Sequence, residues 1–387
     1  MSEVQLTQEE ANARHVRYKD YVACDLAFID CKRSGSHLKE NYAIIGPGVT
    51  SNREQVINLP EPHGFALGAA SMPHGVTNNL HIHYTAEVFL NYRGNWCFRW
   101  GSDGKEGEYF ANPGDVISMP TWIFRGFTNN GADKGWLFTI LGGDDTGGVL
   151  WHPEIIREAR DYGLYINTDN VLIDTGRGDP KPAPSELIEP LCQEDIDGLP
   201  HFTAQQMMSR VVKAEERDWR PAFLDQNIDG CGAQIAPVIG AGMTQNREHQ
   251  AKISSPHGFT TEWLRLETGQ RLSKFWLPEK MVIIVYNGSI NMRLCDHRPI
   301  EVTLGKWDTY SIPGGVWRSL ENITSEMFDC IVILPGDHRK WPRFAQNVVH
   351  DALRGGLGLD PNGYCAASHL LPKHTFVKNW SDAFKSA

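Results

Sequence analysis

The stretch IGPGVTSNRE at residues 45–54 decides the architecture, because a close copy of it, IGAGMTQNRE, returns at residues 239–248. At the same offset of 194 residues, the tripeptide HGF at residues 63–65 returns at residues 257–259. Matches kept in one register over such a distance indicate a tandem duplication. The chain is therefore expected to fold as two similar units.

Each copy reads as a series of short β-strands. Runs of β-branched and aromatic residues, such as Trp96–Trp100 and Ile290–Leu294, are bounded by Gly, Pro, Asn or Asp, which is typical of strands in a sandwich or barrel. We therefore predict an all-β protein of two tandem barrels with short flanking helices. The predicted parts are an N-terminal barrel at residues 20–165, a linker with a helix at 166–214, a C-terminal barrel at 215–345 and a helical tail at 346–387. The predicted helices are Pro153–Tyr162, Thr203–Arg210 and Gln346–Arg354.

Composition and charge exclude several classes of protein. The chain has 387 residues, 41% of them hydrophobic, which suits a folded protein with two cores. Its net charge of −10 argues against nucleic acid as a partner. There is no apolar run long enough to span a membrane, and the polar N-terminus lacks the apolar core of a secretory signal. We expect a cytoplasmic location, with the eight scattered cysteines reduced.

A compact set of metal-ligand residues lies in the first copy. His81, His83 and Glu87, followed by Gly94, fit the pattern H-x-H-x3-E-x6-G. Because side chains alternate along a strand, the two histidines face the same way, and Glu87 returns to that face by even spacing. Two imidazoles and a carboxylate hold a divalent metal on one side and leave its other positions open. The sequence therefore predicts a metal site, with Fe(II) as the first candidate and Mn, Zn or Ni as alternatives.

This pattern resembles the first sequence motif of the cupin proteins. The spacing of Gly114, Pro120, Arg125 and Asn129 resembles their second motif. Since the resemblance extends to both copies, the chain is similar to a bicupin, which implies two tandem cupin barrels, each a double-stranded β-helix of the jelly-roll type. The resemblance also implies a homo-oligomer with a small-molecule substrate.

Departures from the cupin motifs confine the predicted site to the first copy. Where the second motif has a histidine ligand, this chain has Arg125, whose guanidinium only donates hydrogen bonds and cannot bind a metal. Arg125 is either a catalytic residue that clamps a substrate carboxylate or a structural partner of Glu87. Its recurrence as Arg318 favours the structural role. In the second copy the three ligand positions hold Phe275, Leu277 and Met281.

The residues around the predicted ligands indicate a substrate pocket. By strand parity, Phe89 and Asn91 face inward with Glu87. Ile123 and Phe127 likewise face inward with Arg125. His74, a further imidazole, precedes the ligand strand. An apolar pocket around one metal suits a flat organic substrate. The predicted substrate-binding residues are Phe89, Asn91, Ile123, Phe127 and His74.

Three functions are compatible with these features. The leading hypothesis is a non-haem Fe(II)-dependent dioxygenase acting on a small aromatic or enolisable organic acid, because the layout resembles the gentisate/salicylate 1,2-dioxygenase group. The second is a non-oxidative metal-dependent cupin enzyme, such as a lyase, decarboxylase, isomerase or aminohydrolase, in which the metal acts as a Lewis acid. The third is a non-catalytic bicupin that binds a small molecule, with Arg125 paired to Glu87 in place of a metal.

Overall fold

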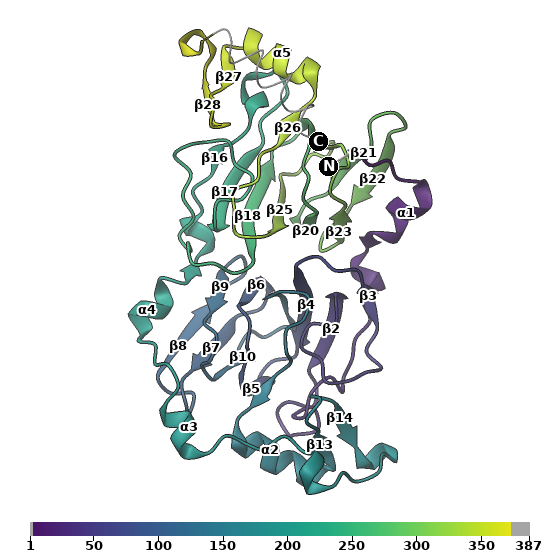
Figure 1. The fold of residues 1–387 in the computed structure, drawn as a ribbon, viewed down its shortest axis with the longest axis vertical. Coiled ribbons are helices and arrows are strands. Elements are labelled where there is room, and N and C mark those ends of the chain that lie inside the picture. Colours follow the sequence, from purple (N-terminus) through teal and green to yellow (C-terminus); the bar gives the residue numbers. More distant parts are fainter. Residues whose placement is uncertain (1–2, 373–387) are drawn as a thin grey trace. The chain divides into compact units, whose positions relative to one another are not determined.

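The structure, a computed structural model, describes residues 3–372 and divides into two compact units (Figure 1). Tyr21–Glu216 form one unit, which we call the N-terminal barrel. The residues up to Asp20, together with those from Arg217 onward, form the other, the C-terminal barrel. These boundaries differ from the predicted ones, because residues 166–214 belong to the N-terminal barrel and the start of the chain belongs to the C-terminal barrel. Residues 373–387 of the predicted helical tail lie outside the described residues.

The N-terminal barrel consists of two facing sheets, so the predicted all-β class with short flanking helices is confirmed. The order of the seven-stranded sheet is β15-β9-β6-β11-β4-β2-β3, and that of the five-stranded sheet is β12-β5-β10-β7-β8. Their strands are β2 (Glu40–Ile45), β3 (Ile57–Leu59), β4 (Phe65–Met72), β5 (Thr77–Ile82), β6 (Glu87–Arg93), β7 (Trp96–Trp100), β8 (Gly107–Ala111), β9 (Val116–Met119), β10 (Arg125–Asn129), β11 (Gly135–Gly142), β12 (Leu150–Trp151) and β15 (Val211–Val212).

The C-terminal barrel repeats this plan except at one edge, where β16 pairs antiparallel with β17 while β3 pairs parallel with β2. Its sheets have the orders β1-β23-β20-β25-β18-β17-β16 and β22-β21-β24-β19-β26. Their strands are β1 (His15–Val16), β16 (Arg220–Pro221), β17 (Gln234–Ile239), β18 (Phe259–Leu266), β19 (Arg271–Trp276), β20 (Met281–Asn287), β21 (Ile290–Leu294), β22 (Ile300–Leu304), β23 (Thr309–Ile312), β24 (Arg318–Glu321), β25 (Phe328–Pro335) and β26 (Arg343–Phe344).

Short helices and two small hairpins flank the barrels. The α-helices are α1 (Gln8–Ala13), α2 (Pro153–Ala159), α3 (Gln193–Asp197), α4 (Ala204–Met208) and α5 (Gln346–Arg354). The 3₁₀ helices are η1 (Tyr18–Asp20), η2 (Arg160–Tyr162), η3 (Thr175–Arg177), η4 (Pro184–Glu186), η5 (Ala214–Glu216), η6 (Leu224–Asn227) and η7 (Ser368–Leu370). The hairpins pair β13 (Leu164–Ile166) with β14 (Leu172–Asp174) and β27 (Leu357–Leu359) with β28 (Cys365–Ala367). Within residues 3–372 no helix has the length and apolar character that a membrane crossing requires.

The core of the N-terminal barrel lies between its two sheets. Phe89 and Leu137 extend inward from the seven-stranded sheet, while Phe98 and Phe127 extend from the five-stranded sheet, and all four are buried. The ring centroids of Phe89 and Phe98 lie 4.8 Å apart, within the range of favourable aromatic pairs. This packing fixes the spacing of the sheets, and therefore the positions of residues at the ends of β5 and β6.

Two matching segments, 7–16 and 203–212, each add an edge strand to a barrel; we call them edge segments. Each begins with a capping box, from Thr7 in α1 and from Thr203 in α4. The strand of the first edge segment, β1, pairs with β23 of the C-terminal barrel, and that of the second, β15, pairs with β9 of the N-terminal barrel. Each edge segment therefore precedes one copy in the sequence and completes the sheet of the other.

Candidate metal centre

The three predicted ligands converge at one end of the N-terminal barrel. His81 lies near the end of β5, His83 directly follows that strand, and Glu87 is the first residue of β6. All three are buried, and one ligand atom from each lies within 4.8 Å of those of the other two. His83 Nε2 and Glu87 Oε1 are 3.3 Å apart. Alternation at the end of β5 accounts for the shared direction of the two histidines, whereas Glu87 reaches them from β6 in the facing sheet.

The protonation of His81 suits a metal ligand. Its Nδ1 lies 2.7 Å from the backbone oxygen of Asn79, which can only accept a hydrogen bond, so Nδ1 carries the proton. Burial, reinforced by His83 and Arg125, holds the pKa of His81 well below its ordinary value. The ring is therefore neutral, and the lone pair on Nε2 is available to a cation.

Unsatisfied polar atoms also indicate that a cation fits here. Among the described residues, His83 Nδ1 and Glu87 Oε2 are buried without a hydrogen-bond partner, an arrangement that costs free energy unless something compensates it. Burial raises the pKa of Glu87, but His83 and Arg125 outweigh it and lower the pKa overall. Glu87 is therefore a carboxylate, and two imidazoles with one carboxylate suit Mn, Fe or Zn.

Arg125 makes the contacts expected of a structural residue. Its side chain is completely buried, donates to the backbone oxygen of Pro120, and places Nε 3.9 Å from Glu87 Oε2. Burial lowers its pKa to about 10, so it stays charged near neutral pH. Arg318 in the C-terminal barrel likewise donates to the backbone oxygen of Pro313, at 3.3 Å. The same contact in both barrels secures the same turn, whether or not metal ligands are present.

Comparisons with known proteins assign the fold. No known protein family matches the sequence, and no curated protein matches it either. The structure is similar to oxalate decarboxylase from Bacillus subtilis at pH 4.6, with a TM-score of 0.54, 13% identity, and coverage of 98% of this chain and 84% of that one. It is also similar to the formate complex of the Lactobacillus farciminis oxalate decarboxylase, with a TM-score of 0.53, 11% identity, and coverage of 98% and 95%.

The fold is that of a bicupin. The two tandem jelly-roll barrels implied by the cupin-like motifs are thus confirmed. Neither of these structures is a gentisate or salicylate dioxygenase, so that finer part of the resemblance is not supported. A homo-oligomeric state and a cytoplasmic location stay predictions.

The three candidate ligands line a small cavity of about 40 Å³. The residues around it come from β2, β4, β5, β6, β10, β11 and β12 and from the loops that adjoin these strands. They are Phe28, Lys39, Glu40, Asn41, Val49, Ala69, Ala70, Met72, Asn78, His81, His83, Glu87, Phe127, Thr139, Val149 and Trp151.

Only Phe127 of the five predicted substrate-binding residues lines this cavity. Phe89 and Ile123 are part of the apolar core between the sheets. Asn91 uses its amide to donate to the backbone oxygen of Gly94 at 3.1 Å, which supports the turn after β6. His74 Nδ1 lies 2.9 Å from the backbone oxygen of Gly131, on a loop. Strand parity therefore identified inward-facing residues, but two of them belong to the core rather than to the cavity wall. Arg125 is likewise absent from the cavity wall.

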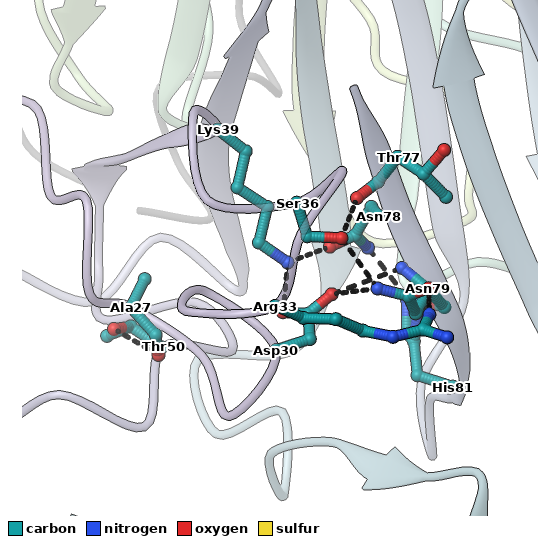
Figure 2. Close-up of polar contacts among 10 residues, drawn as sticks. All are labelled: Ala27, Asp30, Arg33, Ser36, Lys39, Thr50, Thr77, Asn78, Asn79 and His81. Atoms are coloured by element: carbon teal, nitrogen blue, oxygen red, sulfur yellow. Dashed lines mark hydrogen bonds and ion pairs between the residues drawn. The ribbon is translucent and has the colours of Figure 1, made fainter. Parts of the chain in front are cut away.

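Two polar residues on the cavity wall, Lys39 and Asn78, were missed in the sequence. Figure 2 shows the Lys39 ammonium between Asp30 and Asn78, with Asn79 linking this group to His81. Lys39 is remote in sequence from the ligand motif. Asn78 has even parity relative to the odd-numbered ligands. However, β5 shifts register against β10 between Asn78 and His81, where two residues of β5 lie opposite one residue of β10. The irregularity turns Asn78 to the ligand side.

A comparison of the two copies of the repeat does distinguish Lys39 and Asn78. The residues 194 positions later are Ala233 and Leu272, so both polar groups are missing from the copy that also lacks the ligands. The ligand positions of that copy, Phe275, Leu277 and Met281, are buried in its apolar core. The buried candidate ligand set therefore lies in the N-terminal barrel.

Proposed function

We propose that this protein is a metal-dependent enzyme that acts on a small carboxylic acid without net oxidation, with decarboxylation as the first candidate reaction. The observation that carries the proposal is the buried set of His81, His83 and Glu87 on the wall of a small cavity. The similarity to two oxalate decarboxylases supports it, although their low identity speaks for the fold alone.

The size of the cavity argues against an aromatic substrate. A cavity of ~150 Å³ accommodates benzene, whereas a single water needs roughly 10–15 Å³. The volume of about 40 Å³ beside the ligands corresponds to a few waters or an acid of a few heavy atoms. A dioxygenase acting on a hydroxylated benzoate, the leading hypothesis from the sequence, would have to enlarge this space, so the non-oxidative alternative fits better.

The residues of the chain supply binding and exclusion of water. A divalent cation bound by the three ligands would act as a Lewis acid toward a substrate carboxylate. Glu87 stays ionised beside Arg125 and neutralises part of the cation's charge, while His81 is held in the required tautomer by Asn79. Trp151 and Phe127 close the cavity with apolar surface, which strengthens the electrostatic interactions inside it. Decarboxylation replaces the departing CO2 by a proton and consumes no oxidant overall.

The experiment combines a metal measurement with a product measurement. Protein purified without a chelating tag is analysed for metals and is then given Mn²⁺ or Fe²⁺ with oxalate, malonate or other short acids. We expect stoichiometric metal, and CO2 release without stoichiometric oxygen uptake. His81→Ala should lose both. His74→Ala, which changes a nearby histidine outside the cavity, should keep both. Oxygen uptake in proportion to a consumed aromatic acid would overturn the proposal, and so would protein that never binds metal.

A further inference from the structure

We propose that Lys39 and Asn78 form a carboxylate-binding subsite beside the metal ligands, and that the substrate is a small dicarboxylate. This inference rests on the proposed function and specifies its substrate class. It starts from the cavity wall, where Lys39 is the lysine among the lining residues and Asn78 lies next to it in space.

The Lys39 ammonium retains binding capacity toward the cavity. The residue is buried and its Nζ makes a close ion pair with Asp30 and donates to Asn78 Oδ1 at 2.6 Å (Figure 2). An ammonium has three N–H donors, so these two contacts leave one for a ligand. The rings of Phe28 and Trp151 lie 5.0 and 5.4 Å from Nζ and restrict its movement.

Asn78 is placed to act with Lys39. Because its Oδ1 accepts from Lys39, its amide nitrogen points elsewhere, and that nitrogen lies 3.4 Å from His81 Nδ1. The His81 nitrogen already donates to Asn79, so it offers the Asn78 amide no good acceptor. The amide N–H groups of Asn78 are therefore available to an oxygen of a bound anion.

The C-terminal barrel provides a comparison for the alternative that Lys39 is only the structural counterion of Asp30. In the C-terminal barrel, Asp225 is the counterpart of Asp30. Asp225 Oδ2 accepts from the backbone of Ser273 at 2.7 Å, as Asp30 Oδ2 accepts from the backbone of Asn79 at 3.2 Å. The place of Lys39 is taken by Ala233. The fold therefore accommodates a buried aspartate here without a lysine, with the pKa of Asp225 raised by burial, and the lysine occurs only in the barrel that has the candidate metal ligands.

The charges around the cavity favour a dianion. Lys39 is paired with Asp30, Arg125 with Glu87, and Glu40, which also lines the cavity, with Lys134, so these six groups sum to zero. His81 is neutral, and a bound divalent cation would leave an excess of two positive charges in a buried space. An anion with two carboxylates balances that charge, with one carboxylate on the cation and the other on Lys39 and Asn78. The cavity volume of about 40 Å³ favours a short acid of this kind.

The test measures ligand binding apart from turnover. Mn²⁺ is titrated first, and oxalate, malonate and acetate are then titrated into the Mn²⁺-loaded full-length protein by calorimetry. The variants are Lys39→Met with Asp30→Asn, which removes both charges of the pair and leaves no orphan aspartate, and Asn78→Leu, which copies the C-terminal barrel. Lys105→Met, at an exposed lysine paired with Asp103, is the matched control.

We expect both cavity variants to bind Mn²⁺ within threefold of the parent and to bind oxalate or malonate at least tenfold more weakly. Acetate, with a single carboxylate, should lose less than threefold, and Lys105→Met should match the parent. Dicarboxylate affinity unchanged in both variants would reject the subsite. A parent that binds Mn²⁺ but prefers acetate would reject the dicarboxylate and leave metal-dependent catalysis standing. A parent that binds no Mn²⁺ or other divalent metal would reject the proposed function itself.

Discussion

Trp122 adopts a backbone conformation that is costly for its residue type. Its φ of 62° lies in the left-handed region, whereas the equivalent residue of the C-terminal barrel is Gly315, with φ 81°. The exposed Trp122 ring packs edge-on against Tyr84, at 5.2 Å between centroids, and the Trp122 N–H donates to the backbone oxygen of His83 at 3.3 Å. Strain of this kind collects at functional sites, and here the contacts of Trp122 constrain the ligand loop between β5 and β6, which carries His83.

Trp122→Gly should therefore separate stability from metal binding. Relief of strain, worth about 1 kcal/mol, and loss of the aromatic contact, also worth about 1 kcal/mol, should nearly cancel in the free energy of unfolding. The affinity for Mn²⁺ should fall roughly three- to tenfold, because the ligand loop is less constrained. Calorimetric titration and denaturant unfolding measure the two quantities. Trp122→Phe keeps a ring and should regain most of the affinity; equal Mn²⁺ affinity in Trp122→Gly and the parent contradicts this account.

Glu87 provides the second prediction for single residues. In the parent, Mn²⁺ at a hundred times its dissociation constant should stabilise the fold by about 2.7 kcal/mol, because only the folded state binds it. Glu87→Gln removes the anionic ligand, so the thermal shift caused by Mn²⁺ should disappear. The metal-free variant should also unfold more easily, because Arg125 is left buried without its carboxylate partner. A thermal shift as large as that of the parent would show that Glu87 binds no metal.

At the scale of strands, β18 carries a buried carboxyl group that should make stability depend on pH. Glu262 is fully buried, and burial raises its pKa to about 8, although the N–H of Met243 opposes the shift. Because the folded pKa lies above the ordinary value of 4.5, the native state binds the proton more tightly than the unfolded state does. This contribution is complete below about pH 4.5 and is lost as the pH rises to about 8.

Glu262→Gln should flatten this dependence. The parent should lose roughly 2–5 kcal/mol of unfolding free energy between about pH 5 and 8 relative to the variant, since the variant has no proton to release at this site. Denaturant unfolding of both proteins at several pH values provides the measurement. Parallel curves across this range would show that Glu262 is ionised in the native state throughout.

Strand patterns also show what could be predicted from the sequence and what could not. The repeat and the H-x-H-x3-E spacing were sufficient for the bicupin fold and for the convergence of the three ligands, of which Glu87 comes from β6 in the facing sheet. Alternation along the last part of β5 accounts for the two histidines. It fails three residues earlier, where the register shift turns Asn78 toward the cavity. Lys39 could not be placed, because nothing local in the sequence determines which loop reaches the ligands.

At the scale of the whole molecule, the edge segments set where the chain can be divided. A fragment of residues 21–216 contains β15 and should fold, remain soluble and bind Mn²⁺. A fragment of residues 21–202 ends just before the second edge segment and lacks β15, which leaves the edge of β9 open to pairing with other chains. Light scattering and Mn²⁺ titration compare the two fragments. Equal behaviour would mean that the edge strand contributes little to the barrel.

The reciprocal placement of β1 and β15 also bears on the origin of the chain. Two separate one-barrel proteins that trade their leading arms produce the same pattern of pairing. Fusion of the two genes makes this exchange of edge segments intramolecular. After fusion, one copy can lose its metal ligands while the edge segment that precedes it still completes the sheet of the other copy.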